Sequence, residues 1–126
     1  MQPVQITYHF DGILDPLQES IKKYVGMNLY VNPEQDTPLL KPYFKKIFAN
    51  KPDAHIIANI HITKTQAERF DGVFAFTVDG EPVRYERTGS ESFKNPQDLV
   101  NHAFAHLKRE VTGGRGILRK VAKRFK

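Results

Sequence analysis

The sequence predicts an α+β domain of order β-α-β-β-β-α, with both helices packed on one face of a four-stranded sheet. Segments that alternate apolar and polar residues recur four times, and two apolar stripes at helical spacing each follow a proline. With 126 residues and 40% hydrophobic composition, the chain can close one core. We therefore expect one domain over residues 1–111 and a flexible, glycine-rich hinge with a basic tail over residues 112–126.

The first strand and the first helix follow each other closely. Residues 4–10 alternate apolar and polar side chains, as a strand with one buried face does. Asp15 is the expected N-cap of the helix, Pro16 its first residue and Gln18 the second half of a capping box. An apolar stripe continues to Gly26, which either ends this helix or weakens it.

The segment between the first helix and the second strand is rich in proline. Four prolines between residues 32 and 52 exclude one continuous helix. An apolar stripe with lysines on its outer side still predicts a short helix over residues 43–50.

Three more strands are expected over residues 56–63, 74–78 and 83–88, each with period-2 alternation. Asp79-Gly80 predicts a tight hairpin between the last two, because glycine tolerates the positive φ of such turns. The sheet face away from the helices should be polar but not strongly basic. Its expected outward residues are Gln5, Thr7, His9, Asn59, His61, Arg84 and Thr88.

The last helix should begin after Asn95 as N-cap, with Pro96 first and Asp98 in its first turn. His102 and His106 are four residues apart on its polar side, which suits a divalent ion, but no HExxH motif and no third ligand follow. The more ordinary interpretation is two imidazoles that face solvent or RNA. The aromatic residues fit core stripes better than a base-stacking platform.

No catalytic motif is recognisable, and the chain contains no cysteine, so we expect no catalytic residues, no metal and no cofactor. The start of the chain lacks the basic and apolar pattern of a signal peptide, and no apolar stretch is long enough to span a membrane. The sequence-based expectation is a soluble cytoplasmic protein.

Positive charge is concentrated at one end of the chain. All 14 acidic residues lie between Asp11 and Glu110, whereas residues 111–126 carry six cations and no acid. The 13 other Lys and Arg residues leave a net charge of −1 on the rest of the chain, so the overall +5 belongs to the tail. Cations beside flexible glycines favour contact with a polyanion such as RNA. They are Arg115, Arg119, Lys120, Lys123, Arg124 and Lys126.

The order of elements, the hairpin after the second strand and the run from Ser92 to Glu110 resemble the ribosome hibernation-promoting factor family. This family is also called ribosome-associated inhibitor A or sigma-54 modulation protein. The resemblance covers roughly residues 4–111, and the chain would be a short form without the second, dimerising domain of long members. Two features depart from the family: Asn95-Pro96-Gln97 opens the last helix, and the segment over residues 32–52 is long.

The resemblance implies a fold similar to double-stranded-RNA-binding domains and a protein that binds the small ribosomal subunit and limits translation under stress. It further implies that basic residues of the two long helices contact ribosomal RNA. The matching positions are Lys22 and Lys23 on the first helix and Lys108 and Arg109 on the last.

Other interpretations of the residues remain. The tail also fits a solubilising end, a segment that lies on a membrane surface, or an arm by which a protein-interaction module docks an acidic partner. A small hydrolase built on His102 and His106 lacks the third ligand that it would need. The oligomeric state is open, with a monomer favoured.

Overall fold

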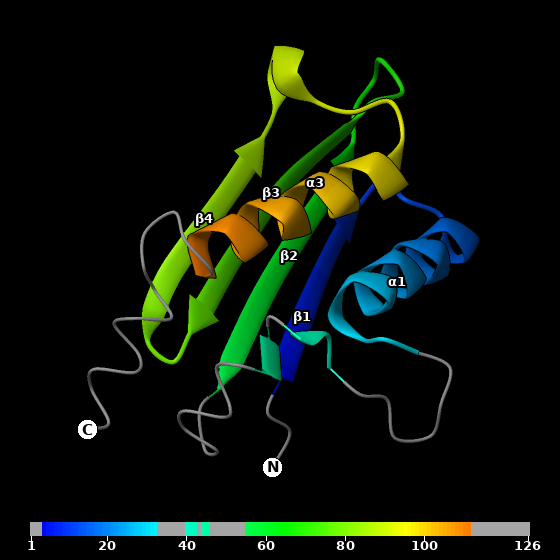
Figure 1. The fold of residues 1–126 in the computed structure, drawn as a ribbon. Helices are drawn as coiled ribbons and strands as arrows, with labels where there is room; N and C mark the ends of the chain where they lie inside the picture. Colours follow the sequence, from blue (N-terminus) through cyan, green and yellow to red (C-terminus); the bar gives the residue numbers. More distant parts are fainter. Residues whose placement is uncertain (1–3, 33–39, 43, 46–54, 112–126) are drawn as a thin grey trace.

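The computed structural model of the chain describes residues 4–32, 40–42, 44–45 and 55–111 (Figure 1). A four-stranded sheet has the order β1-β2-β3-β4, and the two long helices α1 and α3 cover one of its faces. This confirms the predicted α+β class and the order β-α-β-β-β-α. The elements are β1 (Val4–Asp11), α1 (Asp15–Leu29), β2 (Ile56–Lys64), β3 (Phe70–Val78), β4 (Glu81–Arg87), the short 3₁₀ helix η1 (Gly89–Glu91) and α3 (Pro96–Arg109).

The pairing of the strands explains which side chains meet the helices. β1 runs parallel to β2, while β2, β3 and β4 pair antiparallel. Because side chains alternate between faces, the register aligns the apolar positions of all four strands under α1 and α3. The other face is open and polar as expected, although Ile57, 39% exposed, adds an apolar side chain to it.

α1 begins differently from the prediction. Asp15 is its first residue, and Leu14 holds the N-cap position in extended backbone without a side-chain hydrogen bond. Gln18 does not complete a capping box, because its amide donates to the carbonyl of Ile13 at 2.8 Å. Gly26 does not end the helix either, since α1 continues to Leu29.

The hairpin and the cap of α3 are as predicted. Asp79 and Gly80 both have positive φ, 47° and 87°, as a two-residue turn between β3 and β4 requires. The side chain of Asn95 accepts a hydrogen bond from the backbone N–H of Gln97 at 2.8 Å, which caps α3. β3 starts at Phe70, four residues before the predicted start.

The expected helix over residues 43–50 lies mostly outside the described residues. Phe44 is described, and its completely buried side chain belongs to the core. None of the described helices is long and apolar enough to cross a membrane.

The core lies between the sheet and the two helices, and Gly72 of β3 lies close to Leu99 of α3. A Cβ atom added there would lie 2.9 Å from both Cδ atoms of Leu99, which is closer than real contacts allow. Gly72→Ala should therefore lower the free energy of unfolding by about 1–3 kcal/mol through overpacking. Urea unfolding of the variant measures this loss.

A double-mutant cycle tests the cause. Leu99→Ala alone should lower the free energy of unfolding by about 2–5 kcal/mol because it leaves a cavity. The double variant Gly72→Ala/Leu99→Ala should lose less than the sum of the two, since the new methyl group enters the space that Leu99 vacated. Additive losses would contradict the contact between Gly72 and Leu99 as the cause.

Candidate nucleic-acid interface

The described residues carry no net charge, because they contain 11 Lys and Arg and 11 Asp and Glu. Any basic surface on them must therefore come from how the charges are arranged. Four cations of the two helices were predicted as RNA contacts, and all four side chains are exposed: Lys22 and Lys23 on α1, Lys108 and Arg109 on α3.

The packing of the helices separates these cations. α1 and α3 run side by side in the same direction (Figure 1), and Asn28 Nδ2 donates to Asn101 Oδ1 at 2.9 Å between them. Lys23 lies five residues before Asn28, and Arg109 lies eight residues after Asn101. At 1.5 Å of rise per residue, Lys23 and Arg109 are about 20 Å apart along the helices. The structure thus forms two basic positions and not one patch.

Lys22 and Lys108 face in different directions, because Lys22 lies toward the β1 edge of the sheet and Lys108 toward α1. Lys22 Nζ is 3.5 Å from Glu19 Oε1 and 5.7 Å from the ring centre of Tyr8 on β1, the edge strand. Burial raises the pKa of Tyr8 to about 12, so its ring stays neutral and the contact with Lys22 is of the cation–π type. Lys108 lies seven residues after Asn101 and therefore on the side of α3 that faces α1.

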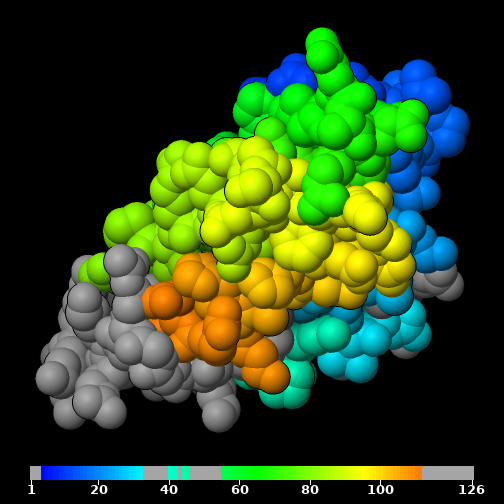
Figure 2. Space-filling view, turned by 90° about the horizontal axis from the view of Figure 1, so that it is seen from above, coloured from blue at the N-terminus to red at the C-terminus, as the bar shows by residue number. Residues whose placement is uncertain are grey.

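Acidic and basic residues separate along the helix pair. The exposed Asp15 and Asp98 lie in the first turns of the two helices, and Glu19 follows in the second turn of α1. Lys108 and Arg109 lie in the last turn of α3, directly before the C-cap Glu110. Figure 2 shows this layer from above, with α3 in yellow and orange between the light green β4 and the blue and cyan α1. A polyanion would meet less repulsion from side chains at the carboxyl end of α3 than at the amino ends of the two helices.

A cluster of rings at the edge between α3 and β4 was missed by the sequence interpretation. The hydroxyl of Tyr85 lies 2.8 Å from His102 Nδ1, and the ring centres of Tyr85 and His106 are 5.7 Å apart. The ring centres of Phe93 and His102 are 5.6 Å apart, and the guanidinium of Arg87 lies 5.6 Å from the ring centre of Tyr85. The two histidines of α3 therefore both contact Tyr85 in this ring cluster, while His102 is exposed and His106 is half-buried.

The surroundings of His102 disfavour the protonated form of its imidazole. Desolvation lowers the pKa of His102, and the positive charges of Arg87 and Arg109 and the proximity of His106 lower it further. Burial also raises the pKa of Tyr85. With the imidazole proton on Nε2, the Tyr85 hydroxyl donates to Nδ1, and protonation of His102 would remove that acceptor.

Stability should depend on pH through His102. Because the pKa of His102 in the fold lies below the ordinary value of 6.5, the unfolded chain takes up a proton at a higher pH than the folded protein. The contribution to stability is complete above the unfolded pKa and is lost as pH falls from there to the folded pKa. Urea unfolding between pH 7.5 and 5 should show this decrease, and His102→Gln should flatten it. His9→Gln, on the open sheet face, serves as the control, and an equal flattening in it would contradict the role of His102.

The open sheet face holds a second polar cluster. His61 Nε2 lies 2.5 Å from Asp11 Oδ2, and the ring of His9 is 6.0 Å from that of His61. The hydrogen bond from His61 lowers the pKa of Asp11. Across the described ranges, no group of three potential ligands could hold a metal ion, and this applies to His102 and His106 as well.

The predicted contacts of the tail lie beyond the described residues, which end at Val111. They are Arg115, Arg119, Lys120, Lys123 and Arg124.

Together, the fold and the exposed cations define a small α+β protein with a two-helix outer face. It is similar to the crystal structure of the Thermus thermophilus Protein Y N-terminal domain, with a TM-score of 0.51 and 12% sequence identity. The match covers 85% of this chain and 94% of that one. At this identity, the likeness shows a shared fold. No protein-family model matches the chain, and no curated protein matches it.

Proposed function

We propose that the protein is a non-catalytic RNA-binding protein of the cytoplasm that associates with the small ribosomal subunit and limits translation under stress. The observation that carries this proposal is the fold shared with the Protein Y N-terminal domain over 85% of the chain. Protein Y belongs to the hibernation-promoting and sigma-54 modulation family that the sequence resembles. The domain over residues 1–111 supplies the surface that recognises the ribosome, and the cations of residues 112–126 add electrostatic affinity for RNA.

The cations of the two helices are the proposed contacts with RNA phosphates. Lys22 and Lys23 on α1 and Lys108 and Arg109 on α3 contact phosphates of ribosomal RNA at two positions about 20 Å apart along the helices. Contacts at two separated positions fix the orientation of the protein on a folded RNA better than one basic patch does. Phosphate contacts of this kind carry no sequence information, so the shape of the RNA contributes to selectivity.

Sedimentation through a sucrose gradient tests the proposal. The tagged protein should travel with small subunits at 50 mM salt and leave them at higher salt, because counterion release drives phosphate binding. Lys23→Glu/Arg109→Glu should lose this association, whereas the exposed Lys64→Glu, at the end of β2, should keep it. Absence of the unmodified protein from every ribosomal fraction would overturn the proposal.

The same gradient distinguishes the alternative of a protein-interaction module. An RNA-bound protein should be released by ribonuclease, whereas a protein docked on an acidic protein partner should stay in its complex. The neutral charge of the described residues leaves the tail as the main electrostatic element in both cases.

A further inference from the structure

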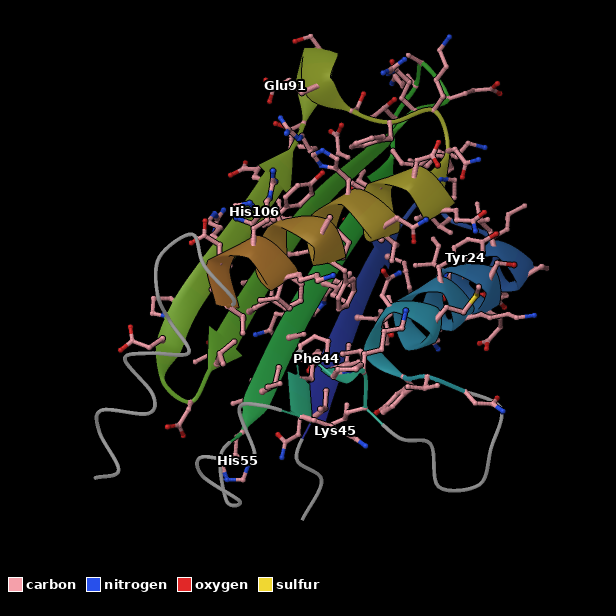
Figure 3. All side chains as sticks on the ribbon, viewed as in Figure 1. Tyr24, Phe44, Lys45, His55, Glu91 and His106 are labelled. Atoms are coloured by element: carbon pink, nitrogen blue, oxygen red, sulfur yellow. The ribbon has the colours of Figure 1, made fainter. Side chains whose placement is uncertain are left out.

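A cavity of about 290 Å³ opens between the last turn of α3 and the outer edge of β4. Pro82 and Arg84 line it from β4, and His106 and Glu110 line it from α3. β4 is the last strand of the sheet, so within the described part of the chain no strand covers this edge. Figure 3 labels His106, whose side chain lies on the β4 side of α3.

The lining combines flat cationic and aromatic groups with a carboxylate. Arg84 and Glu86 alternate with the buried Val83 and Tyr85, so Arg84 starts on the open face of the sheet and lines the cavity at the outer edge of β4. The Arg84 side chain is 65% exposed, and its Nη2 lies 3.3 Å from Glu86 Oε2, an ion pair of the kind that solvent screens. His106 is half-buried, and its ring is supported from behind by Tyr85 at 5.7 Å. Glu110 follows His106 by one helical turn and therefore brings its carboxylate to the same side of α3.

This combination matches a nucleobase. Bases stack on histidine rings and on arginine guanidinium planes. Arginine donates hydrogen bonds to ring carbonyl oxygens, and a glutamate carboxylate accepts them from an exocyclic amine such as N4 of cytosine. The volume is at the lower end of the range for small-molecule sites, about 300 Å³, which suits one base and not a larger ligand.

A cation next to the cavity could bind the RNA backbone on either side of the base. Arg109, one of the proposed phosphate contacts, directly precedes Glu110 at the end of α3. The ring cluster of Phe93, His102, Tyr85 and His106 leads along α3 to the cavity. A base that is paired in a helix cannot enter such a cavity, since its edge and both faces are occupied.

We infer that the cavity between α3 and β4 binds one unpaired, amino-bearing base of RNA, with the adjoining phosphate at Arg109. This inference rests on the proposed function, because it takes RNA as the partner. It adds a base-selective site to the phosphate contacts of the helix layer.

Four RNA hairpins test it, identical except that they carry a bulged cytidine, a bulged uridine, an abasic bulge or no bulge. In fluorescence anisotropy, the protein should bind the cytidine hairpin about tenfold more tightly than the abasic and fully paired ones, since stacking of one base contributes on that order. The uridine hairpin should bind more weakly than the cytidine one, because uracil has no exocyclic amine. Equal affinity for the cytidine and abasic hairpins, or for cytidine and uridine, would overturn the inference.

Variants locate the effect. His106→Ala and Arg84→Gln should each reduce the preference for the bulged cytidine about tenfold and leave the affinity for the paired hairpin unchanged. Arg84 is exposed on an edge strand, so this variant keeps the test valid if His106→Ala affects folding. His9→Ala, on β1 at the opposite edge of the sheet, should behave like the unmodified protein. Retention of the preference in both cavity variants would place the site elsewhere and overturn the inference.

The proposals of ribosome association and of base binding in the cavity can be tested separately, because the hairpin experiment uses no ribosomes. If the protein discriminates the bulge but does not sediment with small subunits, the ribosomal proposal is wrong and the cavity site stands. If it sediments with small subunits but does not discriminate the bulge, the cavity inference is wrong.

Discussion

Phe104→Ala is expected to lower the free energy of unfolding by about 3–5 kcal/mol, a large share of the roughly 5–15 kcal/mol by which a typical domain is stable. Phe104 is the buried side chain by which α3 contacts the middle of the sheet. Its ring meets Phe76 at 5.4 Å and Phe74 at 6.5 Å, both edge to face. Truncation leaves a cavity beneath the helix and removes both ring contacts, so the packing of α3 on β3 is weakened.

Urea unfolding monitored by circular dichroism measures this loss. Phe93→Ala is the matched control, because the same ring is removed from a half-buried position just before α3. Phe93→Ala should lower the free energy of unfolding by well under half as much as Phe104→Ala does. Equal losses in the two variants would contradict the central position of Phe104 in the core.

Removal of residues 112–126 is expected to change the salt dependence of RNA binding more than any other change. If the tail neutralises about four phosphates, the logarithm of the affinity falls with a slope of roughly 3–4 against the logarithm of salt concentration. The affinity of the full chain then falls about a hundredfold between 50 and 200 mM salt. Without the tail, most of this slope should disappear, and titrations of small subunits at several salt concentrations measure it.

Two full-length variants separate charge from apolar contacts. Replacement of the six tail cations by glutamine should act like the deletion, because the phosphate contacts are lost. Replacement of Ile117, Leu118, Val121 and Phe125 by serine should keep the slope, because the charges remain. A slope that survives the deletion would reject the role of the tail in RNA binding, and a slope lost only in the serine variant would favour docking on a membrane or a protein.

The positions where the sequence-based prediction was wrong have local causes. β3 begins at Phe70, but Gly72 interrupts the apolar alternation that would have indicated this start. The pairing of Phe70 with Lys64, and its bridge to Phe93, extend the strand beyond its visible pattern. The first residue of α1 was misplaced by one position because Asp15 and Pro16 are both frequent at helix starts, and the extended backbone of Leu14 decides between them.

The candidate interface was only partly predictable. Helical spacing places Lys23 and Arg109 on exposed helix faces without any structure, because periodicity alone decides which side is buried. Their separation of about 20 Å was not predictable, since it depends on how far α1 and α3 are offset along their axes. The hydrogen bond between Asn28 and Asn101 marks that offset, and it joins residues 73 positions apart.

By itself, the sequence determined the fold class and the placement of positive charge after residue 110, because periodicity and charge are local properties of a chain. Only the tertiary structure decided that His102 and His106 support Tyr85 and that His106 lines a cavity with Arg84. The reason is physical: these contacts join α3 to β4 across the packed edge of the domain, and side-chain packing between distant segments fixes them. The excess of positive charge and the proposed base-binding cavity therefore lie in different segments of the chain.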